Sequence, residues 1–109
     1  MAYDELLANR IRKLLKEQKE LGEKKMFGGV TFMLHGKMCC GVVRDELVVR
    51  VGPGRYDEAL IQPHARPMDF TGRPLKGFVF ITSGGYETEK DLATWVNQAT
   101  KFVSSLRAK

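Results

Sequence analysis

The sequence predicts an α+β fold: a two-layer, mainly antiparallel five-stranded sheet with helices, in the element order α-β-β-β-α-β-β-α. Two patterns favour this class. Apolar residues recur every three or four positions near both ends of the chain, which is typical of helices. Between them, β-prone runs are separated by turn residues, which is typical of hairpin-linked strands. Such strands pair antiparallel, and the helices are expected to cover one face. The length of 109 residues favours a single domain over residues 1–109.

The first segment predicts a helix from about Tyr3 to Glu20. Its apolar residues follow the i, i+4, i+7, i+8 spacing of one helical stripe, at Leu7, Ile11, Leu14 and Leu15. Asp4 is the expected N-cap, because a short carboxylate accepts hydrogen bonds from the free backbone N–H groups of the first turn. Gly22 is the expected stop.

Three apolar runs predict an antiparallel meander, at Met26 to Leu34, Met38 to Val43 and Glu46 to Val51. The His35-Gly36 pair predicts a tight hairpin between the first two runs, because glycine adopts the positive φ that such turns need. Arg44-Asp45 is a weaker turn signal between the second and third. Gly28-Gly29 inside the first run predicts a bulge or a close backbone approach.

The second half of the chain predicts a short helix, two strands and a long helix. Gly52-Pro53-Gly54 ends the third strand, and a helix follows from about Tyr56 to Ile61. The prolines favour an extended connector from Gln62 to Pro67, followed by strands at Met68 to Phe70 and Gly77 to Thr82. In the last helix, Thr88 and Asp91 resemble a capping box. One apolar stripe follows, at Leu92, Trp95, Val96, Ala99, Phe102, Val103 and Leu106.

Composition excludes several protein classes. A hydrophobic content of 43% and a charged content of 28% are typical of a globular domain and untypical of a disordered chain. Uncharged runs such as Met26 to Leu34 are too short to span a membrane, and the acidic N-terminus does not resemble a secretory signal. We therefore expect a cytoplasmic protein with no membrane partner. The net charge of +5 permits weak attraction to nucleic acid without requiring it.

Motifs for catalysis and cofactor binding are not found in the sequence. It contains no phosphate-binding loop, no nucleophile elbow, and neither the HExxH nor the CxxC pattern. Proline in Gly52-Pro53-Gly54-Arg55 removes an amide donor that an anion cradle needs. Cys39 and Cys40 are adjacent, so a strand directs them to opposite faces, and we interpret them as small sheet residues. We expect no enzyme activity, no cofactor and no metal.

The densest polar group lies between His64 and Gly77. Arg66, Arg73 and Lys76 stand there with Asp69, and arginine suits recognition of carboxylates or phosphates. A structural interpretation is that Arg66 pairs with Asp69 while prolines and glycines shape the loop. Lys24 and Lys25, beside Phe27, are further candidates for interaction, and the alternative there is core packing around the aromatic ring.

An ordered set of motifs resembles the TfoX/Sxy N-terminal domain family, from Tyr3 to about Leu106. The matching stretches are Glu23-Lys24-Lys25-Met26-Phe27-Gly28-Gly29 with Phe32-Met33, Met38-Cys39-Cys40-Gly41-Val42, Val49-Arg50-Val51-Gly52, and Arg66-Pro67-Met68-Asp69-Phe70-Thr71-Gly72-Arg73-Pro74 with Lys76-Gly77 and Phe78. The resemblance implies the α+β element order given above. It also implies a bacterial regulator of natural competence that assists a cyclic-AMP-responsive transcription factor. It supplies no catalytic residue.

Two-domain members of that family carry a helical C-terminal domain, whereas this sequence ends at Lys109, so we expect a stand-alone N-terminal domain. The resulting hypothesis is a non-enzymatic regulatory module that acts through a protein partner such as the transcription machinery. The alternatives are weak, sequence-independent nucleic-acid binding and binding of a small anionic ligand. A homodimer is a further expectation, because helices on one face leave the other face open, where we place Thr31, Met33 and Val48.

Overall fold

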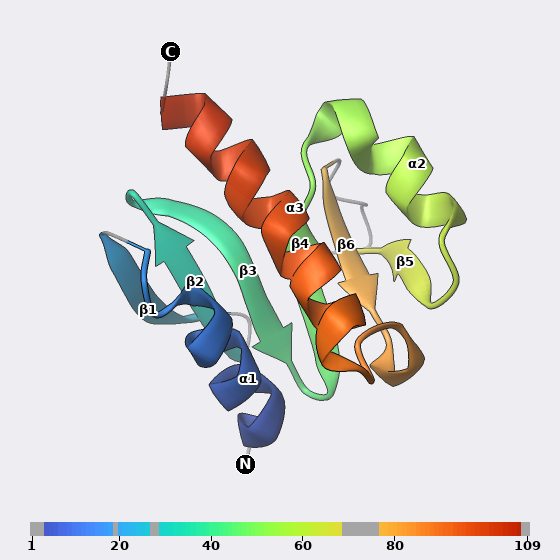
Figure 1. Ribbon diagram of the computed structural model, residues 1–109. Coiled ribbons are helices and arrows are strands. Elements are labelled where there is room, and N and C mark those ends of the chain that lie inside the picture. The colour runs from blue at the N-terminus through green and yellow to red at the C-terminus, as the bar shows by residue number, and fades with distance from the viewer. Residues whose placement is uncertain (1–3, 19, 27–28, 69–76, 108–109) are drawn as a thin grey trace.

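The protein folds into a six-stranded antiparallel sheet covered on one face by three α-helices (Figure 1). The computed structural model describes residues 4–18, 20–26, 29–68 and 77–107. The helices are α1 (Glu5–Leu15), α2 (Tyr56–Ile61) and α3 (Glu89–Arg107). The strands are β1 (Leu21–Met26), β2 (Gly29–Leu34), β3 (Lys37–Val43), β4 (Glu46–Arg50), β5 (Ala65–Pro67) and β6 (Phe78–Ile81). The predicted fold class is confirmed, with one strand more than expected.

The additional strand is β1. Most of its residues lie between the predicted end of the first helix, near Glu20, and the predicted strand run that begins at Met26. Helix α1 ends at Leu15, where its buried stripe ends, because five polar residues follow before the next apolar side chain. Gly22 therefore lies inside β1 and does not stop the helix. The predicted run from Met26 to Leu34 divides into the last residue of β1 and all of β2, which pair antiparallel.

Local signals at the helix starts are confirmed. The Asp4 side chain accepts a hydrogen bond from the Leu7 backbone N–H at 3.1 Å, so it caps α1 as predicted. The Thr88 hydroxyl accepts one from the Asp91 N–H at 3.0 Å, at the start of α3. Helix α2 has the predicted bounds.

The sheet order is β1-β2-β3-β4-β6-β5, so β6 lies between β4 and β5. His35 and Gly36 both have positive φ, as the tight β2–β3 hairpin requires. A Cβ at Gly29 would lie 1.9 Å from the Val42 carbonyl oxygen, which confirms the predicted close approach there. Gly28 lies outside the described residues. Strand β5 (Ala65–Pro67) lies within the expected extended connector. Of the predicted strand from Met68 to Phe70, Met68 is not in a strand, and Asp69 and Phe70 lie outside the described residues.

The helices α1 and α3 pack on one face of the sheet and form the main core with it (Figure 1). The opposite face carries a second, smaller apolar cluster built on Val43, Val48, Met68 and Phe80. Val48 and Thr31 are buried within the single chain, so the expected open dimer face is wrong at these residues. Met33 is partly exposed. None of the described helices is both long and apolar enough to cross a membrane.

The predicted placement of Cys39 and Cys40 on opposite faces is wrong, because β3 contains a bulge. Phe32 pairs with Cys40 whereas Met33 pairs with Met38, so Cys39 is an extra residue in β3. The irregularity turns both cysteines into the main core, where both are fully buried and unbridged. The hydrogen bond that the Cys40 thiol donates to Cys39, together with burial, raises the pKa of Cys40. Both therefore act as small core residues, as interpreted.

Candidate functional site

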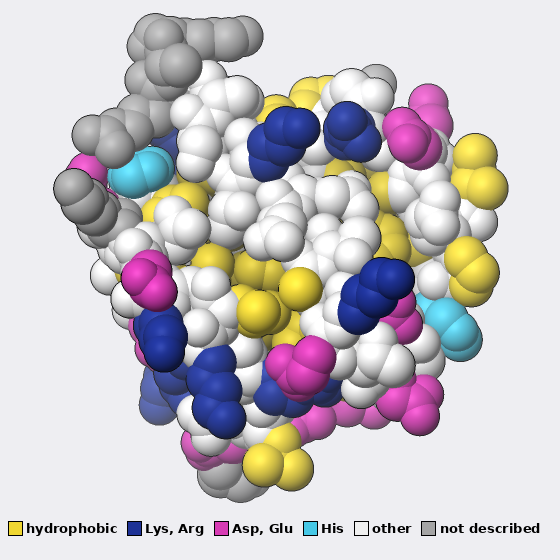
Figure 2. Space-filling view, viewed as in Figure 1, with side chains coloured by type: hydrophobic (Ala, Val, Ile, Leu, Met, Phe, Trp, Pro, Cys, Tyr) yellow, Lys and Arg dark blue, Asp and Glu magenta, His cyan; other side chains and the backbone are white. Residues whose placement is uncertain are grey.

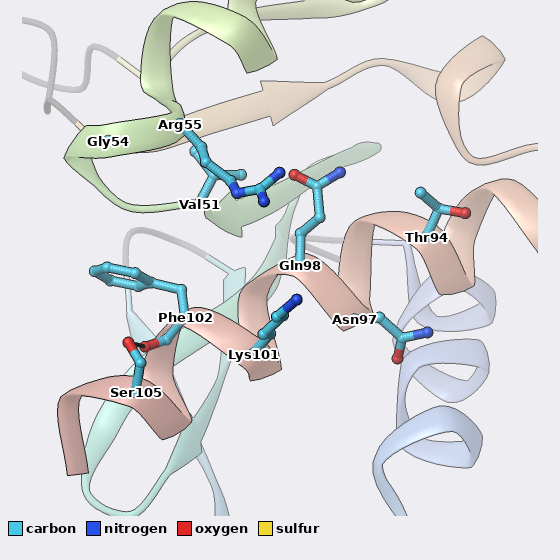
Figure 3. Close-up of a pocket in the computed structure, with 9 residues that line it drawn as sticks. All are labelled: Val51, Gly54, Arg55, Thr94, Asn97, Gln98, Lys101, Phe102 and Ser105. Carbon is cyan, nitrogen blue, oxygen red and sulfur yellow. Dashed lines mark hydrogen bonds between the residues drawn. The ribbon is translucent and has the colours of Figure 1, made fainter. Parts of the chain in front are cut away.

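A cavity lies between α3 and the turn that leads into α2 (Figure 3). This turn is a short 3-10 helix, η1 (Pro53–Arg55). The cavity has a volume of about 570 Å³ and opens to the surface. Its lining residues are Val51, Gly54, Arg55, Thr94, Asn97, Gln98, Lys101, Phe102 and Ser105. We call this feature the α2–α3 groove.

Gly52 determines the position of η1 opposite α3. Its φ is +89°, and a Cβ there would lie 2.4 Å from the Phe102 ring. Glycine is therefore required by both conformation and space. The backbone N–H groups of Val51 and Gly52 both donate to the Gly77 carbonyl, at 2.8 and 3.0 Å. The chain thus leaves β4 in a fixed direction, with Val51 and Phe102 as the apolar floor of the groove.

A stripe of polar side chains on α3 forms the opposite wall. The residues share the spacing of one helix face: Thr94, Asn97, Gln98, Lys101 and Ser105. The hydroxyls of Thr94 and Ser105 donate to carbonyls of their own helix, Lys90 at 2.9 Å and Phe102 at 2.6 Å. Their oxygen lone pairs therefore remain as hydrogen-bond acceptors for a ligand.

Arg55 and Lys101 bring two exposed cations to the same groove. Figure 3 shows the Arg55 guanidinium and the Gln98 amide pointing toward each other across the groove, while Asn97 points away. Among the described residues, neither Arg55 nor Lys101 has an acidic partner. The paired arginines lie elsewhere, at Arg10, Arg12, Arg44 and Arg66.

The groove continues toward α2 as a second cavity of about 190 Å³ that shares Arg55, Thr94 and Gln98 with the first. This end carries the carboxylates of Glu58 and Asp91. The groove therefore has Lys101 at one end, Glu58 and Asp91 at the other, and Arg55 where the two cavities meet.

The structure gives Arg66 a structural role. Its guanidinium makes a two-pronged ion pair with Glu46, with Nε–Oε2 at 2.8 Å and Nη2–Oε1 at 2.6 Å. It also lies 4.6 Å from the centre of the Phe80 ring. Glu46 is only 8% exposed, so the pair is partly desolvated. Glu46 is a partner that the sequence analysis did not name; the predicted partner, Asp69, lies outside the described residues together with Arg73 and Lys76.

Lys24 and Lys25 are exposed on β1, at one edge of the sheet, whereas Arg66 lies on β5 at the other edge. The predicted residues that the structure describes therefore do not form one site. Lysines on an edge strand are also a common protection against pairing with another chain. Figure 2 shows Lys and Arg side chains interspersed with Asp and Glu around the helix-bearing face, an arrangement unlike a continuous basic stripe.

The chemistry of the groove is that of non-covalent binding. It combines two cations, amide and hydroxyl groups and an apolar floor, and no histidine or cysteine lines it. Within the described part of the chain, no three His, Cys, Asp or Glu residues lie close enough to hold a metal ion.

Sequence reasoning missed the groove, although one signal for half of it was present. The polar stripe on α3 contains amides and hydroxyls where a solvated helix face usually carries charges of both signs. In the segment Gly52-Pro53-Gly54-Arg55, the sequence argument concerns only the backbone amide that proline lacks. It does not consider the Arg55 side chain. Only the fold shows that the stripe and Arg55 face each other.

One family model matches the chain: that of the TfoX N-terminal domain, over residues 13–103. The matched range contains all six strands, helix α2, most of α3 and every residue that lines the larger cavity except Ser105. No curated protein and no solved structure was found to match the chain.

Proposed function

The chain belongs to the TfoX N-terminal domain family, and from that premise we propose that it is a non-enzymatic regulatory module that acts by binding a protein partner. The family resemblance implies a role in competence regulation, so the partner we propose is a component of the transcription machinery. The α2–α3 groove is the proposed binding surface.

The observation that supports this function most strongly is the composition of the groove. Protein interfaces combine an apolar centre with a polar rim that can form hydrogen bonds. Here Val51 and Phe102 supply the centre, while Arg55, Gln98 and Lys101 supply hydrogen-bond donors that no described acidic residue uses. Such an arrangement suits partner side chains that enter from solvent.

The same groove favours a protein over a nucleic acid as the partner. A nucleic-acid backbone carries a negative charge at every nucleotide. Glu58 and Asp91 would repel such a chain at the α2 end of the groove. Weak nucleic-acid binding elsewhere on the surface is the alternative function.

Site-specific photo-crosslinking in cells tests the proposal. A benzoylphenylalanine placed at Ser105, which is exposed at the groove, is expected to give a discrete protein adduct upon irradiation. The matched control carries the same photoreactive residue at Lys24, which is exposed on the distant edge strand β1. Adducts at Lys24 and not at Ser105, or at neither position, would contradict the proposed binding surface.

A further inference from the structure

We propose that the part of the α2–α3 groove between Arg55 and Lys101 recognises one carboxylate side chain of the partner, presented beside an apolar side chain. The inference rests on the proposed function and deepens it by naming the chemistry of the partner segment. The occupant is thus a protein segment with an acidic residue next to a Leu-, Ile- or Phe-like residue.

The carboxylate is inferred from Arg55 and Lys101. They approach the cavity from different elements, η1 and α3, and both are exposed. Since no described acidic residue neutralises either cation, a carboxylate between them would be the first to do so. A guanidinium also fits a carboxylate with two parallel hydrogen bonds. The Gln98 amide, which points toward Arg55 in Figure 3, adds a neutral donor.

The apolar neighbour is inferred from the floor beside these cations. Phe102 is half-buried against Gly52, and the Arg50 guanidinium lies 5.5 Å from the centre of its ring. The same guanidinium also lies 5.4 Å from the centre of the Phe78 ring, and it donates a hydrogen bond to the Met38 carbonyl oxygen at 3.3 Å. The ring is therefore held in place before binding, which lowers the entropy lost when a side chain packs on it.

The charge pattern limits the acid to one residue or a short cluster. Glu58 and Asp91 lie at the α2 end of the same groove, so a long acidic run would meet repulsion there. A segment that continues past the carboxylate is expected to offer neutral or basic groups at that end. This polarity fixes the direction in which the segment lies.

Peptide display tests this chemistry without knowledge of the natural partner. A library of random linear heptapeptides is selected on the wild-type chain, on R55Q/K101Q and on the charge-reversed R55E/K101E. The wild type is expected to enrich peptides with Asp or Glu within two positions of a large apolar residue. R55Q/K101Q is expected to lose the acidic preference, and R55E/K101E is expected to favour Lys or Arg instead.

A matched control separates local recognition from general charge. The variant K13Q/K90Q removes two exposed cations outside the groove, one on α1 and one on α3. It is expected to select the same peptides as the wild type. A synthetic form of the best peptide and its Glu→Gln counterpart are then titrated by NMR. We expect the counterpart to bind at least ten-fold more weakly, with shifts at groove residues.

Failure of this inference and failure of the proposed function are distinguishable. Apolar peptides without an acidic preference, equal selection by wild type and R55Q/K101Q, or no enrichment at all would overturn the carboxylate inference. If the Ser105 crosslink persists in that case, the protein-binding function stands with a different chemistry. An acidic preference that K13Q/K90Q also loses would equally overturn the inference, because general attraction to the basic chain would then be its cause.

Discussion

Arg66 and Arg55 carry the same guanidinium group, yet their surroundings differ. Arg66 lies on the sheet, in a two-pronged pair with Glu46 and over the Phe80 ring. Arg55 lies on η1 at the rim of a cavity, with Lys101 as a fellow cation and no acidic partner among the described residues. The first arginine stabilises the fold, whereas the second remains available for a ligand.

The difference teaches that a motif-rich neighbourhood does not by itself make a cation functional. Arg66 stands in the longest motif of the chain, and its charge is nevertheless compensated from within the molecule. Partly buried charges require such compensation, because desolvation disfavours an unpaired ion. An exposed cation has no such requirement, and a binding role is what we propose for Arg55.

The largest expected effect on stability comes from a substitution at Gly52, the residue that precedes η1 in the groove wall. Gly52→Ala places a Cβ 2.4 Å from the Phe102 ring at a φ of +89°. Strain and overpacking together are expected to lower the free energy of unfolding by about 2–4 kcal/mol in urea denaturation. The control is Gly54→Ala, where nothing lies within 4 Å and no positive φ occurs. Equal stabilities of the two variants would contradict this role of Gly52.

The second effect compares the two arginines directly. Glu46→Gln weakens the charged hydrogen bonds to Arg66, and we expect a loss of about 1–3 kcal/mol in the free energy of unfolding. Arg55→Gln is expected to change it by less than about 0.5 kcal/mol. A double-mutant cycle of E46Q with R66Q measures the coupling by urea denaturation. A coupling near zero would show that the pair contributes nothing to stability.

A third prediction compares the reactivity of a thiol at the groove with the reactivity of the two cysteines in the core. Ser105→Cys introduces an exposed thiol, and Ellman's reagent is expected to modify it within seconds to minutes. Cys39 and Cys40 are fully buried, and burial together with the Cys39 hydrogen bond raises the pKa of Cys40, so both should react only through unfolding. The expected count in native buffer is one thiol for S105C and none for the wild type. Rapid reaction of the wild type would contradict the core placement.

The smallest effect concerns an exposed ion pair. Arg12 Nε lies 2.8 Å from Glu23 Oε2, and this hydrogen bond lowers the pKa of Glu23 below 4.5. Stability from the pair is thus present above pH 4.5 and lost as the pH falls through the lowered pKa. Arg12→Gln should cost less than about 1 kcal/mol at pH 7, and a smaller amount at pH 2, where only its contacts with Asn9 and the Phe32 ring remain. Thermal unfolding at both pH values checks this, and an equal cost at both would exclude the ionic origin.

Much of the fold could be predicted because its signals are local. The Asp4 cap, the Thr88 cap and the bounds of α2 all depend on residues within one helical turn. Strand β1 could not be predicted in the same way. As an edge strand it has exposed residues along most of its length, from Gly22 to Lys25, so it lacks the alternation that marks a half-buried strand.

The site required long-range information. Glu46 and Arg66 are 20 residues apart in the sequence. No local pattern predicts that β4 and β5, the strands that contain them, both pair with β6. The bulge at Cys39 likewise depends on the register between two strands. Arg55 and Lys101 meet only because α3 returns across the sheet. Sequence patterns could predict the polar stripe on α3 but not the position of the η1 turn opposite it.

The order of the strands has a consequence for synthesis of the chain on the ribosome. Strands β1 to β4 pair with their neighbours in sequence, so four of the six strands can form from short-range contacts as soon as Arg50 has emerged. The apolar face of these four strands is covered mainly by α3, which follows all six strands in the sequence. A nascent chain therefore presents this face until α3 has emerged, which makes the interval before α3 docks its period of greatest exposure to aggregation.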